Sequence, residues 1–126
     1  MRLSLALAAA AIITAAAPPC GAQSAGDATK GAAVFEEWCS YCHLPAGGGQ
    51  GPSLAGVVGR KAASLAGFNY SQALGSSGLT WTPANLDRFL AGPAKLVPGT
   101  AMQVALPDAA KRADLIAYLA TLAPAR

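Results

Sequence analysis

Three residues able to do chemistry stand together in this chain. Cys39 and Cys42 are separated by two residues, and His43, the only histidine, follows directly. Two thiols with an adjacent imidazole can form a redox-active disulfide, hold a metal ion or attach a porphyrin. A thioredoxin-like disulfide requires a strand–helix–strand context, and no alternating strand pattern flanks these residues. A structural zinc site requires four ligands, whereas the chain offers three Cys/His ligands once its N-terminal segment is removed.

The spacing favours covalent attachment of haem, for which Cys-x-x-Cys-His is the signature. The thiols of Cys39 and Cys42 would bond the two vinyl groups on one edge of the ring, and the imidazole of His43 would bind the iron. One helical turn brings these three groups to the same place. The sequence therefore predicts one haem c, attached through Cys39 and Cys42 and ligated by His43.

A second axial ligand is offered by Met102, the only methionine beyond the initiator. A methionine in a core helix is ordinarily a gap filler, but Pro98 and Gly99 make this segment a turn-rich loop. Met102 follows His43 by 59 residues, which is enough chain to reach the opposite face of a ring. A His/Met pair raises the reduction potential and fills both axial positions. A ligand-binding or peroxidatic haem protein is the interpretation that would hold if Met102 were unbound.

The N-terminal segment predicts export. Residues 3–17 are almost purely apolar, and small residues follow as far as Ala22. This run is shorter than the ~20 residues of a membrane-spanning helix and matches the core of a secretory signal peptide. We therefore expect residues 1–22 to be the signal peptide and 23–126 the mature domain, located in a bacterial periplasm. A retained membrane anchor and lipidation at Cys20 are the alternatives.

Composition limits the fold and the partners. A chain of 126 residues suits one domain, and its 6% aromatic content makes for a thin core that a non-protein group would help to fill. Eight basic and six acidic residues remain after position 22, formally +2, and they are scattered. This pattern lacks the basic stripe of a nucleic-acid binder. No second apolar run is long enough for permanent membrane insertion.

Three helices are predicted to position these residues. The first begins after Asp27 as N-cap, and the second after Thr82, with Pro83 at its first position. The third opens at Pro107 and Asp108. Each carries an apolar stripe at helical spacing; the stripes are Gly31, Val34, Phe35 and Trp38, then Leu86, Phe89 and Leu90, then Leu115, Tyr118, Leu119 and Leu122. The fold class is all-α, with long glycine-rich loops between the helices.

Residues 26–122 resemble a class I c-type cytochrome of the mitochondrial cytochrome c and bacterial cytochrome c2 type. The resemblance rests on motifs in a fixed order: the Cys39–His43 segment, Gly51-Pro52-Ser53-Leu54-Ala55-Gly56-Val57-Val58-Gly59-Arg60, Gly67-Phe68-Asn69-Tyr70, Thr80-Trp81, the Met102 loop and Leu115-Ile116-Ala117-Tyr118-Leu119. It implies the small cytochrome c fold, with three main helices and long loops around one covalently bound haem. It also implies that Gly31 and Phe35 cross the C-terminal helix near Leu115 and Tyr118.

The resemblance implies a function as well. We expect a soluble periplasmic electron carrier, not an enzyme, that cycles one haem iron between ferrous and ferric states. Its partners would be transient: membrane oxidoreductase complexes, oxidases or periplasmic dehydrogenases. A monomer is expected. The alternative is a dedicated electron-accepting cytochrome c subunit of a periplasmic dehydrogenase complex, which would copurify with its enzyme.

Further haem-binding residues follow from matching motif positions. The carbonyl of Pro52 would accept a hydrogen bond from the His43 ring, which orients the imidazole and raises its basicity. Arg60, Tyr70 and Trp81 would surround the haem propionates, because buried carboxylates need charged or hydrogen-bonding partners.

Two departures from the family pattern matter. A tyrosine commonly stands where this chain has Phe89, and its hydroxyl reaches toward the methionine sulfur. Mitochondrial members ring the exposed haem edge with lysines, whereas the matching positions here hold Trp38, Ala94 and Ala101, with Lys95 retained. We therefore predict docking through a small, largely apolar patch with modest electrostatic steering.

Overall fold

The structure is a computed structural model that describes residues 25–124, so the predicted signal peptide lies outside the described residues. Within that range the fold is all-α, as predicted. Its helices are α1 (Ala28–Trp38), α2 (Gln72–Gly75), α3 (Pro83–Ala91), α4 (Pro93–Leu96) and α5 (Ala109–Thr121). The three longer helices, α1, α3 and α5, are the three that the sequence predicts. The β pairing found among residues 25–124 is a single isolated bridge between Lys61 and Thr80.

Each long helix begins at the predicted capping residue. The Asp27 carboxylate accepts hydrogen bonds from two amides in the first turn of α1, and Asp108 does the same for α5. Thr82 accepts from the Asn85 amide, with Pro83 at the first helical position of α3. These side chains satisfy amides that have no partner within the helix, and they fix where each helix starts.

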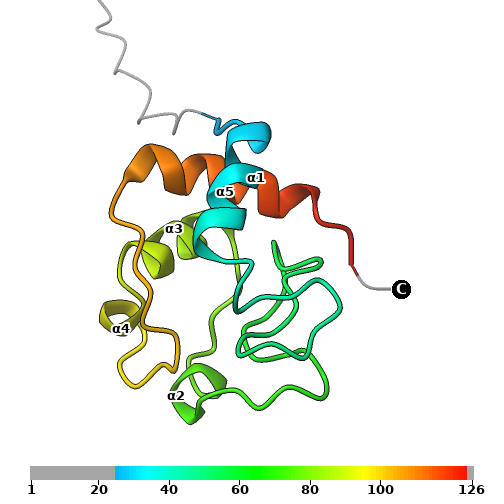
Figure 1. Ribbon diagram of the computed structural model, residues 1–126. Helices are drawn as coiled ribbons and strands as arrows, with labels where there is room; N and C mark the ends of the chain where they lie inside the picture. Colours follow the sequence, from blue (N-terminus) through cyan, green and yellow to red (C-terminus); the bar gives the residue numbers. More distant parts are fainter. Residues whose placement is uncertain (1–24, 125–126) are drawn as a thin grey trace, which may run out of the picture.

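The α1–α5 crossing forms the framework of the fold (Figure 1). A Cβ added to Gly31 would collide with the Asp114 carbonyl and lie 2.7 Å from the Tyr118 Cβ, so the two backbones are in direct contact there. The Phe35 and Tyr118 rings pack with centroids 5.4 Å apart. The Asp27 amide also donates to the Asp114 carboxylate at 2.7 Å. The expected crossing of the two helices is confirmed.

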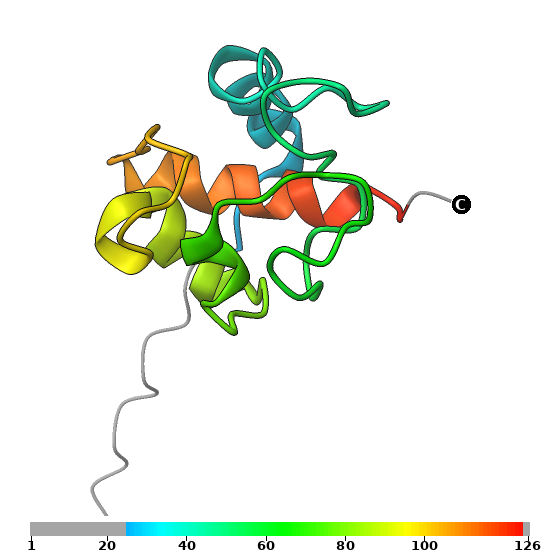
Figure 2. The same ribbon diagram turned by 90° about the horizontal axis from the view of Figure 1, so that it is seen from below.

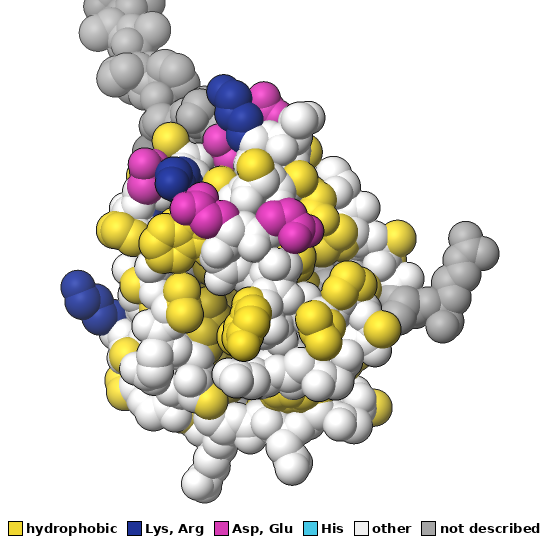
Figure 3. Space-filling model, viewed as in Figure 1, with side chains coloured by type: hydrophobic (Ala, Val, Ile, Leu, Met, Phe, Trp, Pro, Cys, Tyr) yellow, Lys and Arg dark blue, Asp and Glu magenta, His cyan; other side chains and the backbone are white. Residues whose placement is uncertain are grey.

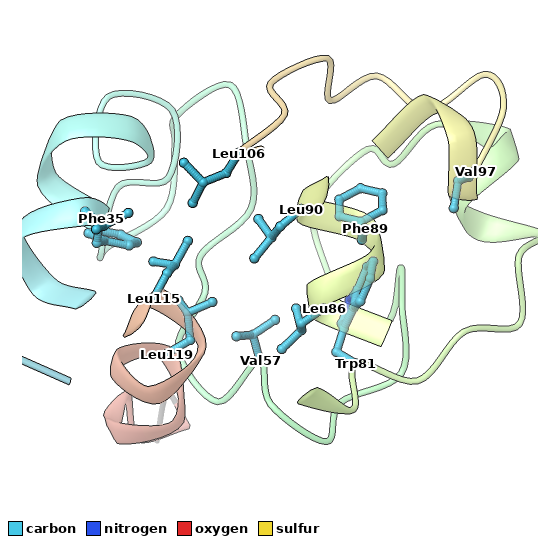
Figure 4. Packing of buried hydrophobic residues seen from close by; sticks show 11 residues of the cluster. Phe35, Val57, Trp81, Leu86, Phe89, Leu90, Val97, Leu106, Leu115 and Leu119 are labelled. Carbon is cyan, nitrogen blue, oxygen red and sulfur yellow. The ribbon is translucent and has the colours of Figure 1, made fainter. Parts of the chain in front are cut away.

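One core unites the helices (Figure 4). Its buried hydrophobic residues are Val34, Phe35, Val57, Trp81, Leu86, Phe89, Leu90, Val97, Leu106, Leu115 and Leu119. The predicted stripes of α1 and α3 therefore face inward, with one exception. Trp38 is 41% exposed and lies beneath the Lys111 ammonium, 6.0 Å from its ring centroid, so its place on the apolar face of α1 does not bury it.

Long loops occupy the rest of the molecule. In Figures 1 and 2, α5 runs from left to right, α3 and α4 lie beside its left half, and the loop between α1 and α2 lies mostly beside its right half. The chain therefore leaves α1 through the Cys39–His43 segment on one side of the core and reaches the Met102 loop on the other. Among the described residues, no helix has the length and apolar character required to span a bilayer.

Candidate functional site

The Cys39–His43 segment continues α1 as a tight turn. The amides of Cys39 and Ser40 both donate to the Phe35 carbonyl, at 2.8 and 2.9 Å. The amides of Cys42 and His43 both donate to the Cys39 carbonyl, at 3.1 and 2.9 Å. Because Phe35 is anchored in the core, α1 fixes the backbone turn that carries Cys39, Cys42 and His43. The predicted one-turn arrangement is present.

Cys39 and Cys42 are both free thiols, each half-buried. Burial, and secondarily the neighbouring Cys42, raises the pKa of the Cys39 thiol from 9.0 to about 11. Redox-active Cys-x-x-Cys pairs instead have a thiol whose pKa is lowered, because the thiolate is the nucleophile. Together with the absence of a flanking strand in the described residues, this counts against a thioredoxin-like disulfide.

His43 is held by Gly51 and Pro52, which follow the glycine run at residues 47–49. Its Nδ1–H donates to the Pro52 carbonyl at 2.8 Å, which is the hydrogen bond that the resemblance implies. The ring also lies against Gly51, where an added Cβ would stand 2.6 Å from Nδ1. With Nδ1 occupied as a donor, Nε2 is the nitrogen left with a lone pair. The imidazole is thus fixed in the tautomer that a metal ligand requires.

Met102 lies half-buried in an extended loop and packs against the same core as Cys39. Thr100, two residues earlier, is 4% exposed, and its amide donates to the Val97 carbonyl at 3.0 Å. The Gln103 side chain donates back to the Thr100 carbonyl at 2.7 Å. These contacts make the loop that presents the thioether an ordered part of the fold.

Two hollows open in the described part of the chain, and the lining of one of them includes His43. One of about 130 Å³ is lined in part by His43, Phe35 and Tyr118. Another of about 210 Å³ is lined in part by Val97 and Pro98, at the start of the Met102 loop.

Two of the three residues expected near the propionates, Arg60 and Trp81, are neighbours. The Arg60 guanidinium donates to the carbonyls of Ala55 and Ser53, at 2.8 and 3.2 Å. Its backbone carbonyl accepts from the Trp81 amide at 2.8 Å, so Arg60 and Trp81 are neighbours. Trp81 is 7% exposed and packs on Phe89, with ring centroids 4.9 Å apart. Tyr70 is half-buried and packs edge-on against Phe68.

The groups present fit a covalently bound haem. Two free thiols lie on one turn, an imidazole beside them has Nε2 available, and a thioether packs on the same core. Thioether bonds, an imidazole ligand and a soft sulfur ligand are the attachments that haem c uses. By contrast, residues 25–124 bring no three His, Cys, Asp or Glu side chains together to hold a metal ion, which counts against the zinc interpretation.

Comparison with known proteins identifies the family. The cytochrome c family model matches residues 28–123. The chain belongs to the cytochrome c family. Cytochrome c2 of Rhodomicrobium vannielii is 50% identical over 79% of this chain and 82% of that protein, and cytochrome c2 of Rhodopila globiformis is 46% identical over 81% and 99%. The solved structure of cytochrome cH from Methylobacterium extorquens is 47% identical, with a TM-score of 0.73 over 76% of this chain and 99% of that one.

Family membership makes the chain a cytochrome c2-type electron carrier, whose cofactor is a covalently bound haem c. Two residues of the site are missed by sequence reasoning. The first is Gly51, against which the His43 ring lies. Its contact could have been expected because it directly precedes Pro52, the predicted hydrogen-bond partner of His43. Arg112, described below, is signalled by its position three residues before Leu115, on the buried face of α5.

Proposed function

We propose that this cytochrome is a soluble periplasmic one-electron carrier whose haem is attached through Cys39 and Cys42 and ligated by His43 and Met102. The observation that carries the proposal is the hydrogen bond from His43 Nδ1 to the Pro52 carbonyl, beside two free thiols on one turn. That bond leaves Nε2 for iron, in a family whose members carry haem c. When bound, the haem supplies a metal that exchanges one electron.

The protein's own residues position and shield that metal. Pro52 and Gly51 hold the His43 imidazole in one orientation and tautomer. The core around Leu115 and Phe89 excludes water, which favours the less charged form of a buried redox centre. Arg60 and Trp81 are joined by a backbone hydrogen bond, and we propose that they, with Tyr70, meet the propionates. No catalytic residue is proposed, because no substrate is transformed.

The mass of the intact exported protein tests attachment and processing together. We expect the mass of residues 23–126 plus one haem. Cys39→Ser combined with Cys42→Ser should abolish the added mass, whereas Ser40→Ala, between the same two cysteines, should retain it. Loss of the haem under non-reducing, denaturing conditions would contradict covalent attachment.

The absorption spectrum of the ferric protein tests Met102. Iron–methionine ligation produces a weak band near the red end of that spectrum. We expect the band in the unaltered protein and its loss in Met102→Ala, with the covalent haem retained. Absence of the band in the unaltered protein would favour a ligand-binding or peroxidatic haem protein instead.

Purification from the periplasm distinguishes a free shuttle from an enzyme subunit. The similarity to two cytochromes c2 and to cytochrome cH is compatible with both. We propose the shuttle, which elutes alone as a monomer. Stoichiometric elution with a dehydrogenase would instead show the dedicated electron-accepting subunit.

An apolar docking patch supports transient partners. The exposed large hydrophobic residues of the described chain are Trp38, Tyr41, Leu44 and Val104. Each lies within two residues in sequence of Cys39, Cys42, His43 or Met102. Figure 3, in the view of Figure 1, shows apolar side chains across the middle of the molecule, acidic side chains above them and basic side chains above them and at the left edge. We propose that redox partners dock on this patch, where Ala94 and Ala101 are also exposed.

A further inference from the structure

Arg112 is a buried cation within the helical core. It is 9% exposed and is the one charged residue among the buried side chains described. Its Nε donates to the Asp87 carboxylate at 2.7 Å, which joins α5 to α3. Burying a guanidinium costs free energy unless it is paired with an opposite charge and its N–H groups have acceptors. A charge at this position therefore needs specific partners.

The same guanidinium also holds the chain that returns from Met102. Its Nη1 donates to the carbonyls of Leu106 and Pro107, at 3.0 and 2.7 Å. The Leu106 amide donates to the Leu90 carbonyl at 2.7 Å. Figure 4 shows Leu106 pointing into the core near Leu90. Arg112 therefore fastens three parts of the fold at one point: α5, α3 and the end of the Met102 loop.

The Met102 loop depends on such anchors. Residues 102–107 form neither helix nor strand, so no ladder of backbone hydrogen bonds fixes them. The start of the loop is held by the buried Val97 and Thr100. The other end is held at Leu106, four residues beyond the thioether, by the Leu90 carbonyl and by Arg112. Fixing both ends of so short a segment limits how far the thioether can move.

We propose that Arg112, oriented by Asp87, is a positioning residue that keeps Met102 at its ligating position. The inference rests on the proposed ligation by Met102. Arginine suits the role because its planar guanidinium has several N–H groups, which donate to the Asp87 carboxylate and to two carbonyls at once. Lysine retains the positive charge but has a single ammonium group in place of the planar guanidinium. It therefore cannot reproduce all three hydrogen bonds.

Competition by imidazole tests the proposal. Imidazole added to the ferric protein displaces a loosely held methionine, and the displacement is followed through loss of the red-end band. We expect Arg112→Lys and Asp87→Asn each to raise the affinity for imidazole about fivefold or more, as expected when a hydrogen bond to a charged group is lost. Arg88→Gln, which removes an exposed arginine next to Asp87 on α3, should leave the affinity unchanged.

Hydrogen exchange at the Leu106 amide provides a second readout. We expect exchange there to accelerate in Asp87→Asn, while amides in the middle of α1 keep their rates. Asp87 is 30% exposed and its replacement leaves Arg112 in place, so this variant carries the test if Arg112→Lys does not fold. Uniform acceleration throughout the protein, with unchanged affinity for imidazole, would reduce Arg112 to a general stabilising role and overturn the proposal.

The outcomes separate this inference from the proposed function. An unaltered protein without the red-end band would overturn ligation by Met102, and the role of Arg112 with it. A band present in the unaltered protein, with imidazole affinity unchanged in both variants, would overturn the role of Arg112 alone.

Discussion

His43 shows how a single side chain is prepared for one task. Its ring is fixed by a carbonyl on one nitrogen and by a glycine backbone against its face. Both contacts come from Gly51 and Pro52, which are consecutive residues. A histidine held in this way presents Nε2 in one direction and in one tautomer. The neighbouring thiols could retain a porphyrin without this arrangement, but the imidazole could not be aimed reproducibly.

Gly51→Ala should disturb this arrangement. The added Cβ would stand 2.6 Å from His43 Nδ1, so either the ring or the loop must shift. We expect a loss of about 2 kcal/mol in the free energy of unfolding, the scale of overpacking at a tight contact, and a lower reduction potential as the imidazole is displaced. Denaturant unfolding and redox titration measure the two effects. An unchanged potential would show that the imidazole tolerates the displacement.

Phe89→Tyr tests the departure from the family pattern. Phe89 is 6% exposed and packs on Trp81, so a hydroxyl added there is buried. An unsatisfied buried hydroxyl would cost about 1–3 kcal/mol, whereas one bonded to the Met102 sulfur would cost far less. We expect stability within about 1 kcal/mol of the unaltered protein, with a shifted reduction potential and a higher pH for loss of the red-end band. If the potential and that pH are both unchanged, the hydroxyl does not reach the sulfur.

At the scale of elements, the α1–α5 crossing aligns the haem-attachment segment with the core. Gly31 lets the two helix backbones touch, and the backbone amide of Asp27 donates a hydrogen bond to the Asp114 carboxylate beside that contact. The Cys39–His43 turn is a direct continuation of α1. The close approach of these helices therefore sets where the thiols lie, even though neither Gly31 nor Asp114 belongs to the site.

Gly31→Ala should be strongly destabilising for this reason. The new methyl group would collide with the Asp114 carbonyl and push α1 away from α5. We expect a loss of about 3 kcal/mol in the free energy of unfolding, despite the better helix propensity of alanine. Gly75→Ala is the matched control, because Gly75 is also helical and an added Cβ there meets open space. Equal effects of the two substitutions in urea denaturation would refute the role of the crossing.

At the scale of the whole molecule, the net charge available to steer a partner is small. Arg112 is paired with Asp87, which offsets its charge, and Arg60 directs its guanidinium to the carbonyls of Ala55 and Ser53. Glu36 and Glu37 are exposed immediately before Trp38, and Lys95 is exposed on α4. With formal charge near +2 for residues 23–126, long-range attraction toward an acidic partner is weak.

Electron transfer to a partner should therefore depend only modestly on salt. Raising the ionic strength from 10 to 200 mM (roughly a fourfold shorter screening length) should change the bimolecular rate less than about threefold. Stopped-flow kinetics measure this dependence. Val104→Asp, within the apolar docking patch, should slow the reaction, while Ala84→Asp, exposed in the first turn of α3, should not. A steep fall of the rate with salt would contradict docking through apolar contacts.

The haem-free chain should be largely unfolded. Only 6% of its residues are aromatic, so its core has few large side chains to support the long loops. Cys39→Ala combined with Cys42→Ala, prepared without haem, should show little helical signal in far-ultraviolet circular dichroism. Native-like helicity in that variant would show that the protein core suffices.

The sequence by itself determined the local features of this protein. The Cys39–His43 spacing, the capping residues Asp27, Thr82 and Asp108, and the helical apolar stripes each depend on neighbours a few residues apart. Such features can be recognised in a linear pattern because short-range geometry fixes them. These features were sufficient to predict the all-α fold class and to recognise the resemblance to the cytochrome c family.

Tertiary structure decided what depends on residues distant in sequence. Trp38 has the correct spacing for the core face of α1, yet it lies at the end of the helix, where it faces the Lys111 side chain of α5, and it stays exposed. The spacing of Arg112 from Leu115 indicates the inner face of α5, but only the meeting of α3, α5 and the segment at Leu106 gives the guanidinium its partners. The spacing of residues along the sequence predicts which face of a helix a side chain occupies. Whether that side chain is buried, and what it contacts, depends on which other segments pack against that face.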